Sequence, residues 1–111
     1  MRVITGTARG VKLETVPGQD VRPTADRVKE GLFSAIHFEL PGRTALDLFA
    51  GSGQLGIEAL SRGASLCVFV DQDRRSQEVI KRNVQAAKVA ERARVLQADA
   101  LSYLARCRER F

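Results

Sequence analysis

Metal-ligating and redox-active residues are scarce in this sequence, which has one histidine, two cysteines and no tryptophan among its 111 residues. Cys67 and Cys107 stand far apart, and neither has a histidine or cysteine at ligand spacing, so the pattern predicts no zinc site and no disulfide. Cys67 lies inside an apolar run, where we expect it to be buried as a small hydrophobic residue. His37 has no recognisable partner for acid–base or metal chemistry, and we interpret it as structural.

Long apolar runs are also absent. No run approaches the ~18 residues that a helix needs to cross a bilayer, and Met1 and Arg2 lead into no signal-peptide core. We therefore expect a cytoplasmic protein with no membrane partner. The composition is that of a globular domain, with 44% hydrophobic and 28% charged residues. The formal net charge of +5 fits a polyanionic partner and an evenly solvated basic surface equally well.

The character of the sequence changes near Gly42, which divides the chain into two predicted segments. Residues 1–42 form an extension that begins with β-prone stretches around Gly6 and Gly10, the pattern of a small hairpin. A helix over residues 24–38 follows, with a threonine at its first position as a candidate N-cap. The basic residues of the hairpin would project from a flat ribbon.

From residue 43 to residue 111, apolar strand patterns alternate with amphipathic helix patterns. The run over residues 66–70 is apolar throughout, as a parallel strand covered on both faces must be. Right-handed connections between such strands build a doubly wound sheet. The sequence therefore predicts an α/β fold, part of a Rossmann-like domain, with strands over 44–49, 66–70 and 94–97 and helices over 53–62, 74–88 and 101–107.

A glycine-rich loop follows the first predicted strand. Gly51, Gly53 and Gly56 have GxGxxG spacing, and they stand after a strand and at the opening of a helix. Asp71 ends the second strand, where a carboxylate can accept hydrogen bonds from both hydroxyls of a ribose. This context favours a nucleotide-like ligand over a purely structural turn.

Such a site could bind a dinucleotide or S-adenosylmethionine, and the charge of Asp47 distinguishes between these two ligands. A carboxylate near the loop would repel the pyrophosphate of a dinucleotide, whereas it would stabilise the ammonium and sulfonium groups of S-adenosylmethionine. Backbone amides of the loop could still bind the methionine carboxylate. Asp99, after the third strand, is placed to accept a hydrogen bond from the adenine amino group or to cap the next helix. We favour S-adenosylmethionine and keep an NAD-type oxidoreductase as the alternative.

Three stretches carry a family resemblance: RVITGTARG at residues 2–10, RPTADRVKEGLF at residues 22–33 and LDLFAGSG at residues 46–53. With them the chain resembles the bacterial small-subunit (16S) ribosomal RNA guanine-N2 methyltransferases, which have a class I fold and use S-adenosylmethionine. The resemblance implies ribosomal RNA or an assembled small subunit as partner. It implies cofactor binding by Asp47, Phe49, Ala50, Gly51, Ser52, Gly53, Asp71, Gln72, Asp99 and Ala100. Contacts to RNA are expected from Arg2, Arg9, Lys12, Arg22 and Arg27, although Arg27 could instead pair with Glu30 on its own helix.

The resemblance also implies a segment that this sequence lacks. In the family, a fourth strand ends in an Asp-Pro-Pro or Asn-Pro-Pro motif with an aromatic residue, which holds the target base, and no Pro-Pro pair occurs here before the last residue, Phe111. We therefore assign no catalytic residue. The chain is expected to supply the cofactor-binding half of the enzyme. The alternative function is that of a noncatalytic RNA-binding or cofactor-binding fragment. The unpaired edge of the first strand offers a surface for self-association.

Overall fold

A parallel β-sheet forms the centre of the computed structural model, which describes residues 2–16, 40–48 and 50–106. Within these residues the strands are β1 (Thr44–Leu48), β2 (Leu66–Asp71) and β3 (Ala93–Gln97), in the order β1-β2-β3. The register sets Asp47 opposite Phe69 and Asp71 opposite Gln97. Because the strands are parallel, their carboxyl ends lie at one edge of the sheet, where ligands of such folds bind.

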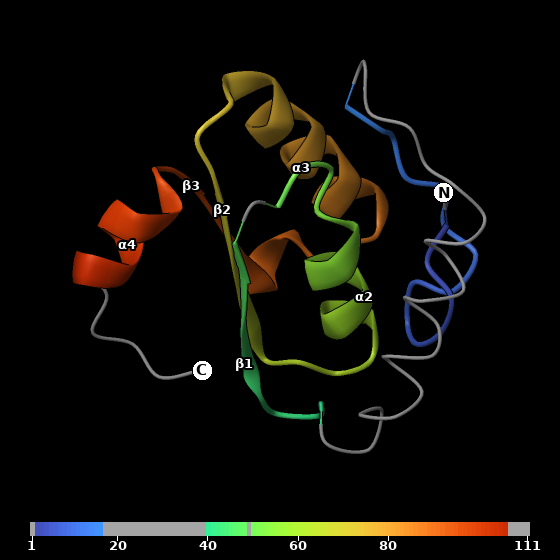
Figure 1. Cartoon of the computed structure of the whole chain (residues 1–111). Helices are drawn as coiled ribbons and strands as arrows, with labels where there is room; N and C mark the ends of the chain where they lie inside the picture. Colours follow the sequence, from blue (N-terminus) through green and yellow to red (C-terminus); the bar gives the residue numbers. More distant parts are fainter. Residues whose placement is uncertain (1, 17–39, 49, 107–111) are drawn as a thin grey trace.

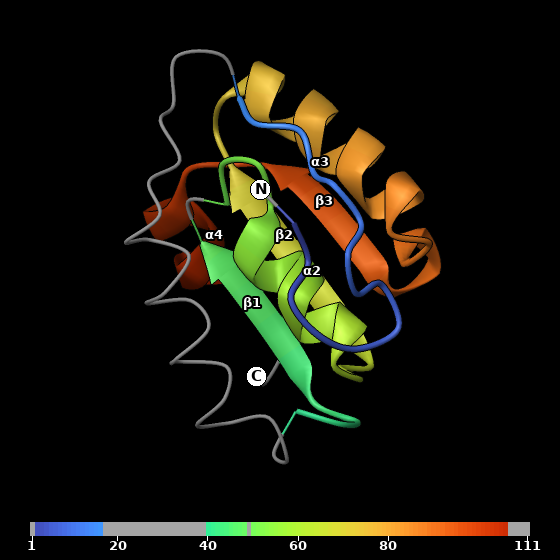
Figure 2. The same ribbon diagram turned by 90° about the vertical axis from the view of Figure 1, so that its right-hand side faces the viewer.

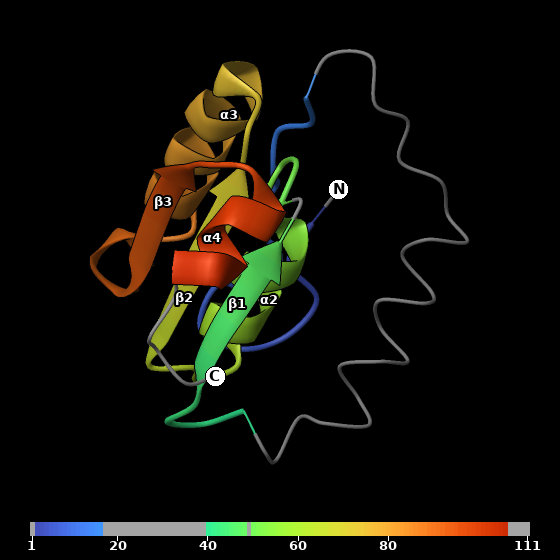
Figure 3. The same cartoon turned by 60° about the vertical axis from the view of Figure 1, so that its left-hand side comes forward.

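Helices cover both faces of this sheet, as Figures 1 and 3 show. Helices α2 (Gln54–Ser61) and α3 (Arg74–Ala86) lie on one face, and α4 (Ala100–Arg106) lies on the other. A short 3₁₀ turn, η2 (Ala90–Arg92), leads from α3 into β3. The predicted alternation of strands and helices is confirmed with small shifts in the bounds, whereas the helix predicted over residues 24–38 lies outside the described residues.

The middle strand is the most buried element. Cys67, Val68, Phe69 and Val70 of β2 are fully buried, since one set of alternating side chains faces α2 and α3 and the other set faces the α4 side. The prediction that Cys67 is buried as a small hydrophobic residue is therefore confirmed. The amphipathic pattern of α3 also matches its position in the fold, because its apolar residues are buried against the sheet.

Residues 2–16 form an extended segment, the N-terminal arm, that crosses α2 and runs beside α3 (Figure 2). The arm folds back on itself, but the predicted hairpin is reduced to a single antiparallel bridge between Arg2 and Lys12. The reason is that the amides of Ile4 and Thr5 donate to the side chain of Glu58 in α2. A longer ladder would need the amide of Thr5, which faces the other leg of the arm, so the arm pairs with the helix in place of extending its own strands.

Candidate functional site

The loop between β1 and α2 turns sharply at its glycines. Gly53 is the N-cap residue of α2 and has φ 81°, a left-handed conformation that glycine adopts without steric cost, and its amide donates to the carbonyl of Ala50 at 2.8 Å. Gly56 serves another purpose, because a Cβ there would collide with the Phe69 ring and the Cys67 Sγ. The first turn of α2 can therefore pack closely on β2, which brings the loop down onto the tips of the strands.

Asp71 fastens this loop to the end of β2. Its Oδ2 accepts a hydrogen bond from the amide of Gly51 at 2.9 Å, and its Oδ1 accepts one from the amide of Asp73 at 2.8 Å. The residue is half-buried. A carboxylate offers about four lone-pair positions, so the two oxygens of Asp71 retain capacity for further donors such as hydroxyl groups.

Asp47 lies beneath the first turn of α2 and not in the loop itself. Its Oδ2 accepts a hydrogen bond from the amide of Gly56 at 3.1 Å, and the residue is 9% exposed. Burial raises the pKa of Asp47 to about 7, the Gly56 amide opposes that rise, and the nearby Asp71 carboxylate adds to it. The carboxyl group therefore titrates near neutral pH, and a cation bound beside it would favour the ionised form.

Asp99 stands at the start of α4, one residue past the main-chain contact between Ala98 and Asp71. Its Oδ2 accepts hydrogen bonds from the amide and the hydroxyl of Ser102, at 3.1 and 3.3 Å. The capping role that the sequence predicted is confirmed. The side chain is exposed, and a role toward adenine stays a prediction.

The other predicted cofactor residues differ in how the structure places them. Gln72 is exposed beyond the tip of β2, and its carbonyl accepts a hydrogen bond from Gln97 at 3.3 Å. Ser52 is buried in the loop, Ala50 packs into the core cluster, and Ala100 opens α4. Phe49 lies outside the described residues.

Three polar residues that the sequence reasoning missed hold the arm in place. Glu58, fully buried in α2, accepts from the amides of Ile4 and Thr5 at 2.8 and 3.1 Å and from the Arg62 Nε at 2.9 Å. Ser61, also in α2, and Asn83, in α3, bind other parts of the arm. Their common sequence signal is a polar residue on the buried face of an amphipathic helix, which calls for a partner in the fold.

Three of the five predicted RNA contacts lie on the arm, and the other two lie outside the described residues. Arg2, Arg9 and Lys12 are exposed on the arm, and the bridge sets Arg2 and Lys12 opposite each other. Arg22 and Arg27 lie outside the described residues. The exposed part of the arm therefore carries three basic residues, whereas Val3, Ala8 and Leu13 are buried in the same core cluster as residues of α2 and β2.

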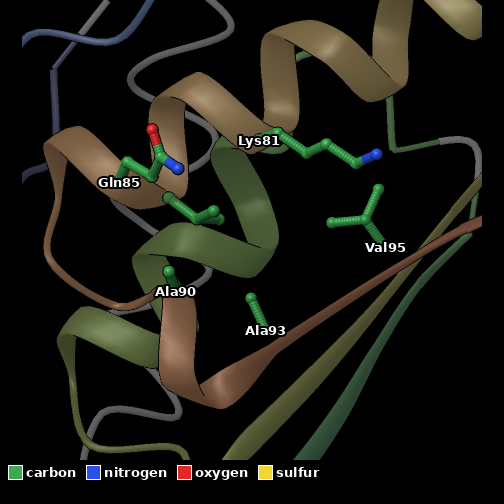
Figure 4. A pocket seen from close by; sticks show the side chains of 6 residues that line it. Lys81, Gln85, Ala90, Ala93 and Val95 are labelled. Carbon is green, nitrogen blue, oxygen red and sulfur yellow. The ribbon is translucent and has the colours of Figure 1, made fainter.

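Asp71 and Asp99 do not line either of two hollows that lie among the described residues. One, of about 280 Å³, lies between α3 and β3, where Lys81 and Gln85 project above Ala90, Ala93 and Val95 (Figure 4). The other, of about 190 Å³, lies beside Asp47 under α2 and is otherwise lined mainly by apolar side chains. The three predicted carboxylates thus share one end of the sheet without lining either hollow together. No cluster in the described part of the chain has the composition of a metal site.

Comparison with known proteins connects this arrangement to one family. The family model described as conserved hypothetical protein 95 matches residues 1–110. The chain is 47% identical over 100 residues to YlbH of Bacillus subtilis, which covers 90% of this chain and 54% of that protein. It is 41% identical over 105 residues to the ribosomal RNA small subunit methyltransferase D of Haemophilus influenzae, which covers 94% of this chain and 54% of that protein.

Solved structures agree with the sequence matches. The structure of yhhF from Escherichia coli has a TM-score of 0.84 at 43% identity and covers 95% of this chain and 57% of that one. An O-methyltransferase of Bacillus cereus, solved with SAH, has a TM-score of 0.68 at 20% identity over 86% of this chain and 43% of that one, a likeness of fold. The fold is therefore that of Rossmann-like class I methyltransferases. The chain spans about half the length of the relatives that it matches.

Proposed function

Because this chain belongs to the conserved hypothetical protein 95 family, that of ribosomal RNA small subunit methyltransferase D, we propose that it is half of such an enzyme. Residues 43–111 would bind S-adenosylmethionine, and residues 1–42 would contact RNA. The reaction would be methyl transfer to the exocyclic N2 of a guanine in 16S ribosomal RNA. A ribosomal RNA substrate would place the protein in the cytoplasm.

The observation that carries the cofactor assignment is the hydrogen bond from the Gly51 amide to Asp71, since it brings a carboxylate and a glycine turn together at the tip of β2. Asp71 keeps acceptor capacity for ribose hydroxyls, and Asp99 presents an exposed carboxylate at the next strand end. Asp47 adds a buried acidic group near Asp71. These groups fit a ligand with hydroxyls and positive charges better than they fit a pyrophosphate.

The cofactor, when bound, would supply an activated methyl group, so the protein would contribute mainly by positioning. Asp71 would orient the ribose and Asp99 the adenine, while Gly51, Ser52 and Gly53 would shape the loop around the methionine portion. Phe49, Ala50, Gln72 and Ala100 belong to the same proposed site. Asp47 would hold its negative charge more readily once a cation lay beside it.

RNA binding is proposed for the exposed basic residues of the arm. Arg2 and Lys12 face solvent side by side, and Arg9 lies at the turn between them. Phosphate contacts of this kind release counterions, so binding should weaken steeply as salt rises. Arg22 and Arg27 are proposed as further contacts on the ground of the family motif alone.

Calorimetry with S-adenosylhomocysteine and with NAD tests the cofactor assignment. We expect the first to bind and the second not to bind, and the reverse result would refute the assignment. Tritiated methyl transfer to undermethylated 16S RNA or small subunits then tests the reaction. Binding of the cofactor without any transfer would identify the chain as a binding module.

Self-association through the outer edge of β1, which pairs with no other strand among the described residues, stays a prediction that sedimentation can check.

A further inference from the structure

The side chain of Asn83 makes hydrogen bonds to both the N-terminal arm and the glycine loop. It stands in α3 and is 1% exposed. Its Nδ2 donates one hydrogen bond to the carbonyl of Ser52 and another to the carbonyl of Glu14, each at 2.9 Å. Its Oδ1 accepts the amide of Glu14 at 2.8 Å.

These three bonds engage both N–H groups of the amide and one acceptor position of its oxygen. A change on either side therefore leaves a buried polar group without its partner, which costs more than the bond itself contributed. If the arm moves away at Glu14, Asn83 loses partners there and its contact with the loop is disturbed. If the loop moves at Ser52, the contact of Asn83 with the arm is disturbed in the same way.

Other contacts place the same two segments against α3. Gly53 of the loop packs on Ile80, since a Cβ there would lie 3.2 Å from the Ile80 Cγ1. On the arm, the Glu14 carboxylate pairs with the Arg82 Nε at 2.8 Å. Helix α3 thus supports the arm through two consecutive residues, Arg82 and Asn83, and the loop through Ile80 and Asn83.

We propose that Asn83 is a positioning residue that links the docked arm to the conformation of the glycine loop, so that docking of the arm favours cofactor binding at the loop. This inference rests on the proposed function for its ligand, the cofactor. The link itself belongs to the ligand-free molecule. By thermodynamic reciprocity, whatever docks the arm raises cofactor affinity by the same factor by which the cofactor stabilises the docked arm.

A second anchor of the arm supplies a matched control. The Ser61 Oγ accepts the amide of Ala8 at 2.9 Å and donates to the carbonyl of Thr5 at 2.6 Å, and its carbonyl accepts the amide of Thr7 at 2.8 Å. Ser61 ends α2, at the opposite end of that helix from the glycine loop. Removing its hydroxyl loosens the arm without touching the loop.

The test compares Asn83→Ala, Glu14→Pro and Ser61→Ala by amide hydrogen exchange in the ligand-free chain. Glu14→Pro removes the arm's amide donor and the carboxylate that pairs with Arg82, but it leaves the Asn83 side chain and its bond to Ser52 intact. We expect Asn83→Ala and Glu14→Pro to speed exchange at Gly51 and Gly53 by roughly tenfold, the scale of one lost hydrogen bond. Ser61→Ala should speed exchange only in the arm.

Calorimetry with S-adenosylhomocysteine gives the second readout. Affinity should fall roughly fivefold to tenfold in the first two variants and stay unchanged in Ser61→Ala. Unchanged exchange in the loop of Glu14→Pro would overturn the proposal, and so would an equal effect of Ser61→Ala, which would indicate general loosening. If Asn83→Ala fails to fold, Glu14→Pro decides alone. A wild-type chain that does not bind the ligand refutes the proposed function, whereas the exchange data still decide the link.

Discussion

Replacing Asp47 with asparagine should stabilise the ligand-free protein at pH 8 while weakening its affinity for the cofactor. The carboxyl group is buried under α2 and accepts one hydrogen bond, from the Gly56 amide. An asparagine has nearly the same shape and keeps an oxygen for that bond, but it carries no charge that burial would penalise. The substitution therefore isolates the cost of the buried charge.

The magnitude follows from the pKa of Asp47, which burial raises from 3.8 to about 7. Between those two values the folded state binds more protons than the unfolded state, so stability falls as pH rises through this window. One pKa unit corresponds to about 1.4 kcal/mol, so the loss at pH 8 is at most about 4 kcal/mol. Asp47→Asn escapes this loss, and its advantage over the wild type should vanish near pH 4.

Urea denaturation of both proteins from pH 4 to pH 8 measures the effect, since the difference between them cancels the titration of other groups. Asp73→Asn is the matched control with the opposite sign. Hydrogen bonds from Arg75 lower the pKa of Asp73, so its carboxylate stabilises the protein at neutral pH and loses that effect as the solution becomes acidic. A free-energy difference between Asp47→Asn and wild type that does not change with pH would refute the reasoning.

Three further predictions concern separate parts of the molecule. Asp71→Ala should weaken S-adenosylhomocysteine binding by about 1–3 kcal/mol, because the ribose and the Gly51 amide both lose an acceptor, and calorimetry that finds unaltered affinity would disprove this role. Glu58→Ala should destabilise the fold by about 3–5 kcal/mol, since it removes the buried carboxylate that pairs with Arg62 and accepts two arm amides, which urea denaturation would detect. Replacing Arg2, Arg9 and Lys12 together should reduce the slope of log affinity for RNA against log salt concentration by about two. An unaltered slope would exclude the arm as the RNA contact.

Most of the fold could be predicted from the sequence. The strand over 66–70 and the helix over 74–88 follow from local patterns of apolar residues, and the structure moves their ends by at most two residues. The glycine loop was recognisable because its spacing stands between a strand and a helix. Its third glycine, Gly56, is needed for close packing on Phe69, as the motif requires.

The course of the arm and the state of Asp47 were less accessible. The sequence predicts a hairpin because β-prone residues flank Gly6 and Gly10, but Glu58 accepts the Thr5 amide that a longer ladder would use. Asp47 was expected as a charge beside the loop, whereas the structure buries it beneath α2 and raises its pKa to about 7. Both differences come from residues distant in the chain.

The sequence by itself determined the α/β alternation, the glycine turn and the acidic residues that end successive strands, because periodicity and turn chemistry act over a few neighbouring positions. Only the tertiary structure decided which buried polar groups are paired. Asn83 binds Glu14 and Ser52 across separations of 69 and 31 residues, and no local pattern specifies such partners. The physical reason is that a polar group loses its water when it is buried, and the available partner depends on which distant segment packs beside it.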